Sequence, residues 1–296
     1  MSAHTFADWR ALSEGLQPEG RAFIRGRYCE AASGDRFATL NPANGLPLAL
    51  VASCDEQDAE LAVGHARAAF RRGDWSALAP AGRKAVLLRL AGLVERHAEE
   101  LALLDSLDMG KPISNSLNVD LPAAVRCLRW NAEAIDKVYG EVAPTGPDSL
   151  GLVTREPLGV VAALVPWNFP LMMACWKIAP ALAAGNAVIL KPSEKSPLSA
   201  IRLAALAREA GLPDGILQVL PGYGHTLGKA LAREEVFGPV LAVIGFDGAD
   251  EAVAIANDSP YGLAAAVWTQ NLDRALTTAR RLESARCSST TTPAAT

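Results

Sequence analysis

The sequence predicts an α/β fold in which helices cover both faces of a parallel sheet. Between residues 159 and 220, three short runs rich in Val, Ile, Leu and Ala alternate with apolar stretches long enough for helices. Continuous apolar strands separated by helices are typical of parallel sheets buried on both faces. Half of the 296 residues are hydrophobic, which is ample for one large domain or two smaller ones.

The first part of the chain is predicted to be helical. One helix begins after Asp55, a good N-cap, and carries apolar residues at helical spacing. A second helical region ends at Gly110 and Pro112. The elements predicted here are helices over 56–72, 80–109 (one long helix or two joined ones) and 115–137, followed by loop and polar strand over 141–156.

After residue 157 the pattern changes to short strands that alternate with helices. The predicted elements are strands over 159–165, 187–190 and 216–220, helices over 171–184, 197–210 and from His225 onward, and later strands over 240–246 and 263–269. In parallel sheets of this kind, ligands bind beyond the carboxyl ends of the strands. We therefore look for chemistry in the residues that follow each strand.

The composition argues against several classes of partner. The 28 basic and 32 acidic residues give a net charge of −4, and no Lys/Arg stripe indicates nucleic acid. The five cysteines are scattered without a CxxC pair, which fits a reducing cytoplasm and argues against a disulfide framework or a zinc site. No signal peptide is indicated, and Pro, Asn and Lys interrupt the most apolar stretch, 158–190, too often for a membrane helix. We expect a cytoplasmic protein without nucleic-acid or membrane partners.

The first predicted strand is followed by Pro-Trp-Asn-Phe-Pro at 166–170. Taken alone, this segment is explained about equally well as a proline-bounded turn with a buried tryptophan. Alternatively, the side-chain amide of Asn168 could donate a hydrogen bond to an oxyanion that develops on a substrate carbonyl. Both interpretations stay open at this point.

The second and third strands are also followed by unusual polar turns. In Lys-Pro-Ser-Glu at 191–194, a lysine and a glutamate are usually solvated surface charges. Lys191 and Glu194 could instead hold the hydroxyls of a ribose, with Glu194 accepting two hydrogen bonds. The glycines of 221–228 have GxGxxxG spacing, whereas dinucleotide sites have GxGxxG, so this turn by itself indicates no more than a helix entry.

In this order and at these spacings, the three segments resemble the cofactor domain of the aldehyde dehydrogenase superfamily. The resemblance extends from about residue 23 to 282 and includes Asp-Met-Gly-Lys-Pro at 108–112 and Glu-Glu-Val-Phe-Gly-Pro at 234–239. Within the superfamily the chain is most similar to the γ-glutamyl-γ-aminobutyraldehyde dehydrogenases of putrescine breakdown. The segments that carry this finer resemblance are 72–76, 129–140 and 191–200.

The resemblance implies an aldehyde-dehydrogenase-like fold, with a Rossmann-like cofactor domain that contains a parallel sheet and an incomplete remnant of a catalytic domain. The implied division is an NAD-binding N-terminal domain over 1–232 (with an assembly-strand region over 141–157), a remnant of the catalytic domain over 233–283 and a non-native tail over 284–296. The family is homo-oligomeric. Its substrate is a small-molecule aldehyde, which it oxidises to a carboxylic acid with NAD or NADP.

The resemblance also implies roles for individual residues. Asn168 is the implied catalytic residue, as the oxyanion donor. The implied cofactor-binding residues are Pro166, Trp167, Lys191, Ser193, Glu194, Gly224, Glu235 and Phe237. Because the Glu194 carboxylate should repel a 2′-phosphate, NAD is the expected cofactor and NADP is the alternative. No metal is expected.

The sequence lacks the family's main catalytic segments. The family uses a cysteine thiolate to attack the aldehyde and a glutamate to activate water. Neither the GQxC-type nor the ELGGK-type segment occurs, and the glycine-serine-threonine turn that supports the cofactor pyrophosphate is absent too. Cys175 lies in an apolar stretch and is expected to be a buried structural thiol; Cys29, Cys54, Cys127 and Cys287 are not convincing replacements. We therefore expect this chain to be inactive.

Two anomalies indicate how these segments were lost. The chain passes directly from Leu-Ala-Arg, ending at Arg233, into 234–239, and resembling proteins can carry a short Leu-small-Arg string at both places. We interpret this seam as the loss of a large internal segment. The tail 284–296 has no core-forming pattern, and for one choice of codons a one-nucleotide frame shift converts it into the apolar strand that the family has next. The DNA sequence decides this, because a tail that cannot be so regrouped excludes the frameshift.

The sequence leaves three functions open: an NAD-dependent aldehyde oxidoreductase, a non-catalytic nucleotide-binding remnant, and a scaffold that keeps only subunit contacts through 141–156. Aldehyde-dependent NADH production would support the oxidoreductase. Cofactor binding without turnover would support the nucleotide-binding remnant, and the lack of both signals would support the scaffold. Because the remnant over 234–282 would expose apolar faces, we also expect poor solubility or aggregation.

Overall fold

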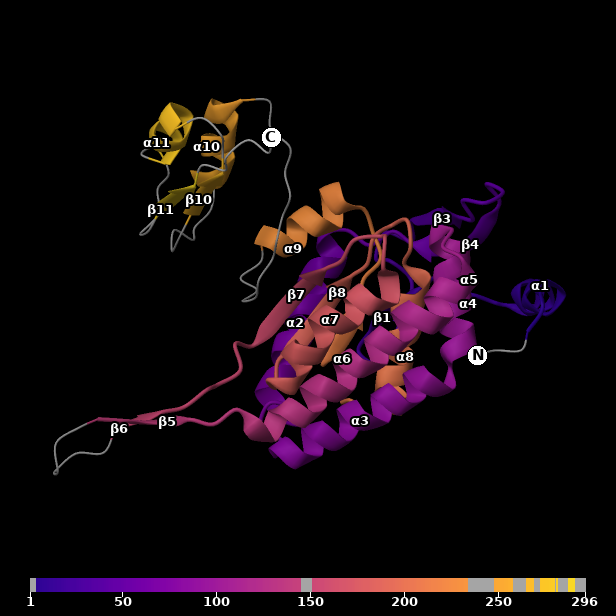
Figure 1. Cartoon of the computed structure of the whole chain (residues 1–296), viewed down its shortest axis with the longest axis horizontal. Helices are drawn as coiled ribbons and strands as arrows, with labels where there is room; N and C mark the ends of the chain where they lie inside the picture. Colours follow the sequence, from indigo (N-terminus) through magenta and orange to yellow (C-terminus); the bar gives the residue numbers. More distant parts are fainter. Residues whose placement is uncertain are drawn as a thin grey trace, which may run out of the picture. The chain divides into compact units, whose positions relative to one another are not determined.

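The computed structural model describes residues 4–144, 151–233, 248–257, 265–268, 272–279, 281 and 287–290 (Figure 1). The chain divides into two compact units, Met1–Leu241 and Ala242–Thr296. The first unit contains the sheet and all three turns that the sequence singles out.

The first unit is built on a five-stranded sheet in the order β2-β1-β9-β8-β7. Its strands β7 (Val160–Leu164), β8 (Ala187–Lys191) and β9 (Leu217–Val219) run parallel, which confirms the predicted parallel sheet. Every residue of these strands except Leu164 is buried. Burial from both faces explains why they read as continuous apolar runs.

The sheet as a whole is mixed, because an N-terminal hairpin extends it. Strand β1 (Ala22–Ile24) pairs antiparallel with β9 and with β2 (Arg27–Cys29). The two residues of the hairpin turn, Arg25 and Gly26, both have positive φ, as two-residue hairpin turns of the common type require.

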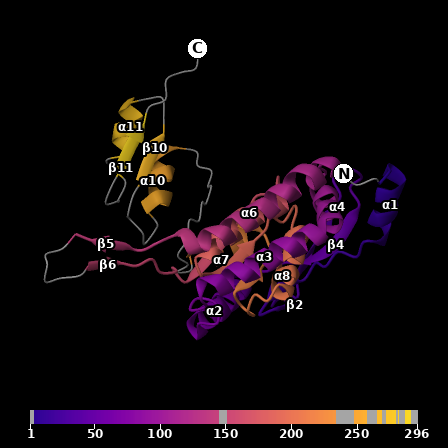
Figure 2. The same ribbon diagram turned by 60° about the horizontal axis from the view of Figure 1, so that its bottom comes forward.

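Helices cover both faces of this sheet (Figures 1 and 2). They are α2 (Glu56–Arg72), α3 (Pro80–Arg96), α6 (Leu121–Ala134), α7 (Pro170–Ala183) and α8 (Leu198–Glu209). Helices α7 and α8 connect the parallel strands and pack on one face, with α3 and α6 packed against them. Helix α2 packs on the opposite face, where the buried side chain of Gln218 in β9 donates to the Ala62 carbonyl at 2.8 Å.

The predicted helix boundaries are largely confirmed. Helix α2 has the predicted bounds and begins after Asp55, whose carboxylate caps its first turn. The predicted region 80–109 is two helices, α3 and α4 (Ala98–Met109), which meet at His97. Helix entry near His225 is also confirmed, by η3 (Gly224–Gly228) and α9 (Lys229–Arg233).

The predicted helix 115–137 is interrupted. It consists of α5 (Ile113–Asn115), the π-helix η1 (Ser116–Asp120), α6 and the 3-10 helix η2 (Ile135–Lys137). A π-helical turn is rare and recurs at functional sites. The apolar spacing of the sequence continues through this region, so it does not reveal the interruption.

Besides β1 and β2, three further elements precede residue 56, where the sequence analysis predicts no helix or strand. Helix α1 (Phe6–Gly15) is capped by Thr5, and β3 (Arg36–Leu40) pairs antiparallel with β4 (Pro47–Ala52). The sequence carries no strong periodic signal for any of them.

The predicted assembly-strand region forms a hairpin of β5 (Glu141–Ala143) and β6 (Gly151–Val153), which extends away from the rest of the first unit (Figure 1). Val142 and Leu152 are direct cross-strand partners in it. Their exposures are 70% and 63%, so the hairpin presents apolar side chains to solvent.

The second unit contains α10 (Ala249–Asn257), β10 (Ala265–Trp268), α11 (Leu272–Ala279) and β11 (Cys287–Thr290). Strand β10 falls within the predicted strand 263–269, whereas the predicted strand 240–246 lies outside the described residues. Within the tail 284–296, which the sequence analysis describes as lacking a core-forming pattern, the structure has strand β11, which pairs in parallel register with β10. Helix α11 packs against this strand, and its polar sequence gives no apolar signal for it.

No helix within the described ranges combines the length and the apolar character that a membrane crossing requires.

Candidate functional site

The three turns that follow β7, β8 and β9 lie together at the carboxyl end of the parallel sheet. The Val165 N–H donates to the Lys191 carbonyl at 3.1 Å, and the Ser196 hydroxyl donates to the Trp167 carbonyl, also at 3.1 Å. These bonds join the first turn to the second. The sheet topology thus brings together residues that are far apart in the sequence, as expected for a ligand site in a parallel sheet.

In the first turn, Pro166, Trp167 and Asn168 are all exposed. Trp167 is 51% exposed, so the interpretation of this segment as a turn around a buried tryptophan is wrong. Asn168 lies just before helix α7, whose N-cap is Phe169. Asn168 is therefore exposed to solvent near the carboxyl end of the sheet.

In the second turn, Lys191 is not a solvated surface charge. It is 4% exposed, and its Nζ donates to the Pro192 carbonyl at 2.9 Å and lies 3.6 Å from Glu194 Oε2. Burial lowers the pKa of Lys191, and the neighbouring Glu194 carboxylate partly opposes that shift. Glu194 keeps one third of its side chain exposed, and Ser193 is half-buried. The turn thus presents to a ligand one carboxylate that a buried cation holds in place.

The glycines of the third turn have different structural roles. A Cβ at Gly222 would lie 2.5 Å from the Cys54 carbonyl oxygen, so no side chain fits there. A Cβ at Gly228 would meet the Leu164 side chain at 3.5 Å and the Lys191 stem at 3.8 Å, which are ordinary packing contacts, so this glycine lies close beside the lysine. At Gly224 a Cβ would meet nothing within 4 Å, which leaves open space beside the turn. Of these three glycines, only Gly224 has open space beside it that could admit a ligand.

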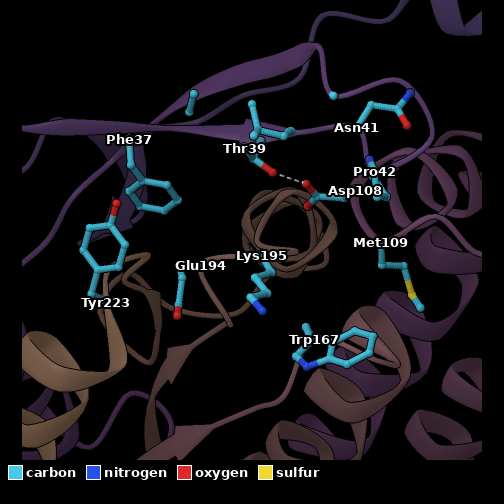
Figure 3. Close-up of a pocket in the computed structure, with 13 residues that line it drawn as sticks. Phe37, Thr39, Asn41, Pro42, Asp108, Met109, Trp167, Glu194, Lys195 and Tyr223 are labelled. Atoms are coloured by element: carbon cyan, nitrogen blue, oxygen red, sulfur yellow. Dashed lines mark hydrogen bonds between the residues drawn. The ribbon is translucent and has the colours of Figure 1, made fainter.

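A cavity of about 530 Å³ opens beside two predicted cofactor-binding residues, Trp167 and Glu194 (Figure 3). Its other walls include Lys195 and the rings of Phe37 and Tyr223, whose centres are 5.3 Å apart. The cavity combines aromatic surfaces with a carboxylate. Of the predicted site residues that the structure describes, Pro166, Asn168, Lys191, Ser193 and Gly224 do not line this cavity.

Helix α4 supplies two buried aspartates that the sequence analysis missed. Asp105 Oδ2 accepts a hydrogen bond from the Leu171 N–H of α7 at 3.4 Å, and Asp108 Oδ2 accepts one from the Leu198 N–H of α8 at 3.0 Å. Neither α7 nor α8 has a side-chain cap from its own N-cap residue. One face of α4 therefore caps the two helices that follow the first and second turns. The signal for them was two aspartates spaced i, i+3 in an otherwise apolar stretch of α4.

Burial raises the pKa of both aspartates to about 7. The Ser199 hydroxyl and the Leu171 N–H act against burial at Asp105, and the Thr39 hydroxyl and the Leu198 N–H do so at Asp108. Figure 3 shows the hydrogen bond from Thr39 to Asp108 at the edge of the cavity. The hydrogen bonds by which Asp105 and Asp108 support the site turns therefore depend on the protonation of these two carboxyls.

Four of the five cysteine thiols are unsuited to nucleophilic attack. The pKa values of the Cys29, Cys54, Cys127 and Cys175 thiols are all raised above the ordinary value, and burial is the largest cause in each case. Because the thiolate is the nucleophile, a raised pKa lowers reactivity. The expectation of a buried structural thiol at Cys175 is confirmed, since its exposure is 0%.

Two predicted cofactor-binding residues, Glu235 and Phe237, lie outside the described residues. Within the described part of the chain, no group of three or more His, Cys, Asp or Glu side chains is arranged to hold a metal ion.

Comparison with known proteins gives two matches to one family model. The model of the aldehyde dehydrogenase family matches residues 28–233 and, separately, 229–294. The two matched segments overlap at 229–233, next to the seam at Arg233.

Individual relatives agree with this match. The NADP/NAD-dependent aldehyde dehydrogenase PuuC of Escherichia coli (strain K12) is 58% identical over 233 residues, 79% of this chain and 47% of PuuC. Indole-3-acetaldehyde dehydrogenase in complex with NAD⁺ superposes with a TM-score of 0.77 and 40% identity, covering 99% of this chain and 93% of that chain. The γ-glutamyl-γ-aminobutyraldehyde dehydrogenase of Burkholderia cenocepacia J2315 superposes with a TM-score of 0.74 and 36% identity, covering 99% and 92%. The chain spans about half the length of the curated relative.

Proposed function

Because this chain belongs to the aldehyde dehydrogenase family, we propose that it binds NAD at the turns after β7, β8 and β9 and does not itself oxidise aldehydes. The observation that carries the proposal is the Lys191–Glu194 pair, in which a buried ammonium holds a partly exposed carboxylate at the carboxyl end of the sheet. A carboxylate in this place can accept hydrogen bonds from both hydroxyls of a ribose.

The chemistry of the turns fits a dinucleotide. Glu194 supplies acceptors for the ribose, and Gly224 leaves open space where a nucleotide can approach the backbone. When bound, NAD would supply the hydride acceptor of the family's reaction. Trp167 and Pro166 would cover part of the ligand, and the Asn168 amide would face a substrate carbonyl.

We propose that NAD is preferred to NADP. A 2′-phosphate on the ribose would bring its negative charge to the Glu194 carboxylate, and like charges repel. The preference is graded, since the relative PuuC carries both cofactors in its name.

The state of the thiols supports the proposal that the chain does not oxidise aldehydes. Four of the five cysteines have raised pKa values and contribute little thiolate at neutral pH. The sequence also lacks the segments that carry the family's cysteine and glutamate. The two overlapping family matches at 229–233 support the loss of an internal segment at this point.

For the lineage from which the chain derives, we propose an aldehyde that carries an amino or amide group as the substrate class. The support is the name of the Burkholderia structure and the similarity to PuuC. Family members assemble as homo-oligomers, and we propose the exposed β5–β6 hairpin as the part of this chain that keeps that capacity.

The test is isothermal titration of the purified full chain with NAD and NADP, with an aldehyde oxidation assay and an intact relative as control. Saturable NAD binding that Glu194→Ala abolishes, without NADH production, supports the proposal. NADH production from an aldehyde that a thiol alkylating agent stops would show the oxidoreductase function instead. If neither binding nor turnover is seen while the relative is active, the scaffold function replaces both.

A further inference from the structure

Lys111, which belongs to the segment 108–112 and follows helix α4, lies against the first site turn. Its Nζ is 3.8 Å from the centre of the Phe169 ring. An ammonium at this distance is attracted by the aromatic face, and the attraction grows as water is excluded. The Lys111 side chain is only 14% exposed, so the contact is largely shielded.

Two further contacts hold Lys111 in place. Its ammonium forms an ion pair with Asp120, whose side chain is 2% exposed, and its carbonyl accepts a hydrogen bond from the Ser106 hydroxyl at 2.6 Å. Asp120 is the last residue of the π-helix η1. The rare helical turn therefore ends at the carboxylate that fixes this lysine.

Phe169 is the residue through which Lys111 can act on the turn. It is the N-cap of α7 with φ −145° and ψ 68°, and its side chain provides no cap hydrogen bond. Because the Phe169 ring lies against a fixed cation, this contact holds the backbone in place where the turn meets helix α7. Two residues earlier, Trp167 is exposed toward the proposed ligand.

We propose that Lys111 is a positioning residue for nucleotide binding: held by Asp120, it fixes the Phe169 ring and so the orientation of the turn 166–170. The inference rests on the proposed function only in naming a nucleotide as the ligand. The fixing of the turn is measurable without any ligand.

The experiment follows the turn and the ligand separately. The full chain is labelled with 5-fluorotryptophan, and the ¹⁹F signal of Trp167 is assigned among the six tryptophans with Trp167→Phe. Because Lys111→Met alone would strand a buried carboxylate and could unfold the chain, the pair is neutralised together as K111M/D120N. K111R and F169Y keep the contact, and F169L removes the ring while leaving the ion pair. K137M is the matched control, since Lys137 also pairs with an aspartate, Asp136, but is 62% exposed.

We expect the Trp167 signal to shift or broaden in K111M/D120N and F169L, and to stay as in the unmodified chain in K111R, F169Y and K137M. The Kd for NAD should rise about five- to tenfold in the first two variants. Adding F169L to K111M/D120N should cause no further change, because both act through one contact.

An unchanged Trp167 signal in K111M/D120N would overturn the inference, even if that variant melts at a lower temperature. So would fully additive effects of K111M/D120N and F169L. If the unmodified chain does not bind NAD, the proposed function fails, but the ¹⁹F comparison still decides whether Lys111 positions the turn.

Discussion

The Asp108 carboxylate of helix α4 caps helix α8 by accepting a hydrogen bond from the Leu198 N–H at 3.0 Å. The bond crosses from one helix to the start of another, 90 residues later in the chain. It supports the segment that follows the Lys191–Glu194 turn.

Removing this cap should destabilise the first unit. We expect Asp108→Ala to lower the free energy of unfolding by about 2 kcal/mol, because the Leu198 N–H and the Thr39 hydroxyl both lose a buried acceptor. Urea unfolding followed by circular dichroism measures it. Asp74→Ala, at an aspartate whose side chain is 56% exposed, is the control and should change the stability by less than about 0.5 kcal/mol. Equal effects of the two substitutions would contradict the capping role.

Stability should fall as pH rises from about 4 to about 7. Burial raises the pKa of Asp105 and Asp108 to about 7, so over this window the folded chain keeps protons that the unfolded chain releases. Their contribution is fully present below the unfolded pKa, near 3.8, and is lost as pH passes the folded value. The slope contributed by each group is at most about 1.4 kcal/mol per pH unit.

The matched variant for this prediction is D105N/D108N, which mimics the neutral form at every pH. Its unfolding free energy, measured by urea titration from pH 4 to pH 7.5, should decline less steeply than that of the unmodified chain. Parallel curves for the two proteins would show that these carboxyls do not control the pH dependence.

Two glycines of the third turn should respond differently to the same substitution. Gly222→Ala should cost about 2 kcal/mol of stability, because its Cβ would collide with the Cys54 carbonyl. Gly224→Ala should leave the melting temperature unchanged but weaken NAD binding, since the space beside it is open and is proposed to admit the nucleotide. Thermal unfolding and NAD titration of both variants test this, and normal NAD affinity in G224A would remove Gly224 from the site.

Glu194→Gln should shift the cofactor preference toward NADP. The substitution keeps the size of the side chain but removes the charge that opposes a 2′-phosphate, so the ratio of the Kd for NADP to that for NAD should fall on the order of tenfold. Titrations at two salt concentrations measure the ratio, and the difference should shrink at high salt. An unaltered ratio would mean that the 2′ position lies away from Glu194.

The β5–β6 hairpin should promote self-association. Val142 and Leu152 form an exposed apolar cross-strand pair, so Leu152→Lys should lower the average mass of the chain in light scattering after size exclusion. Leu46→Lys, at another leucine that is 62% exposed, is the control and should have no such effect. Association that persists in L152K would assign it to another surface.

Local signals predicted much of the first unit correctly. The bounds of α2 follow from the Asp55 cap and helical spacing, and the strands β7, β8 and β9 follow from apolar runs between turns. These features are encoded within a few residues, so the sequence reveals them directly. The sequence likewise predicted that the three site turns lie together, because parallel strands place their carboxyl ends at one edge of the sheet.

The sequence by itself determined the family, the α/β class and the turns proposed as the site, because short motifs and periodicity express local physics. Only the tertiary structure decided that Lys191 is buried, that Trp167 is exposed, and that Asp105 and Asp108 cap helices 66 and 90 residues away. Such burial and capping depend on packing, which brings backbone groups that are distant in the sequence within hydrogen-bond distance. No local pattern in the chain contains that information.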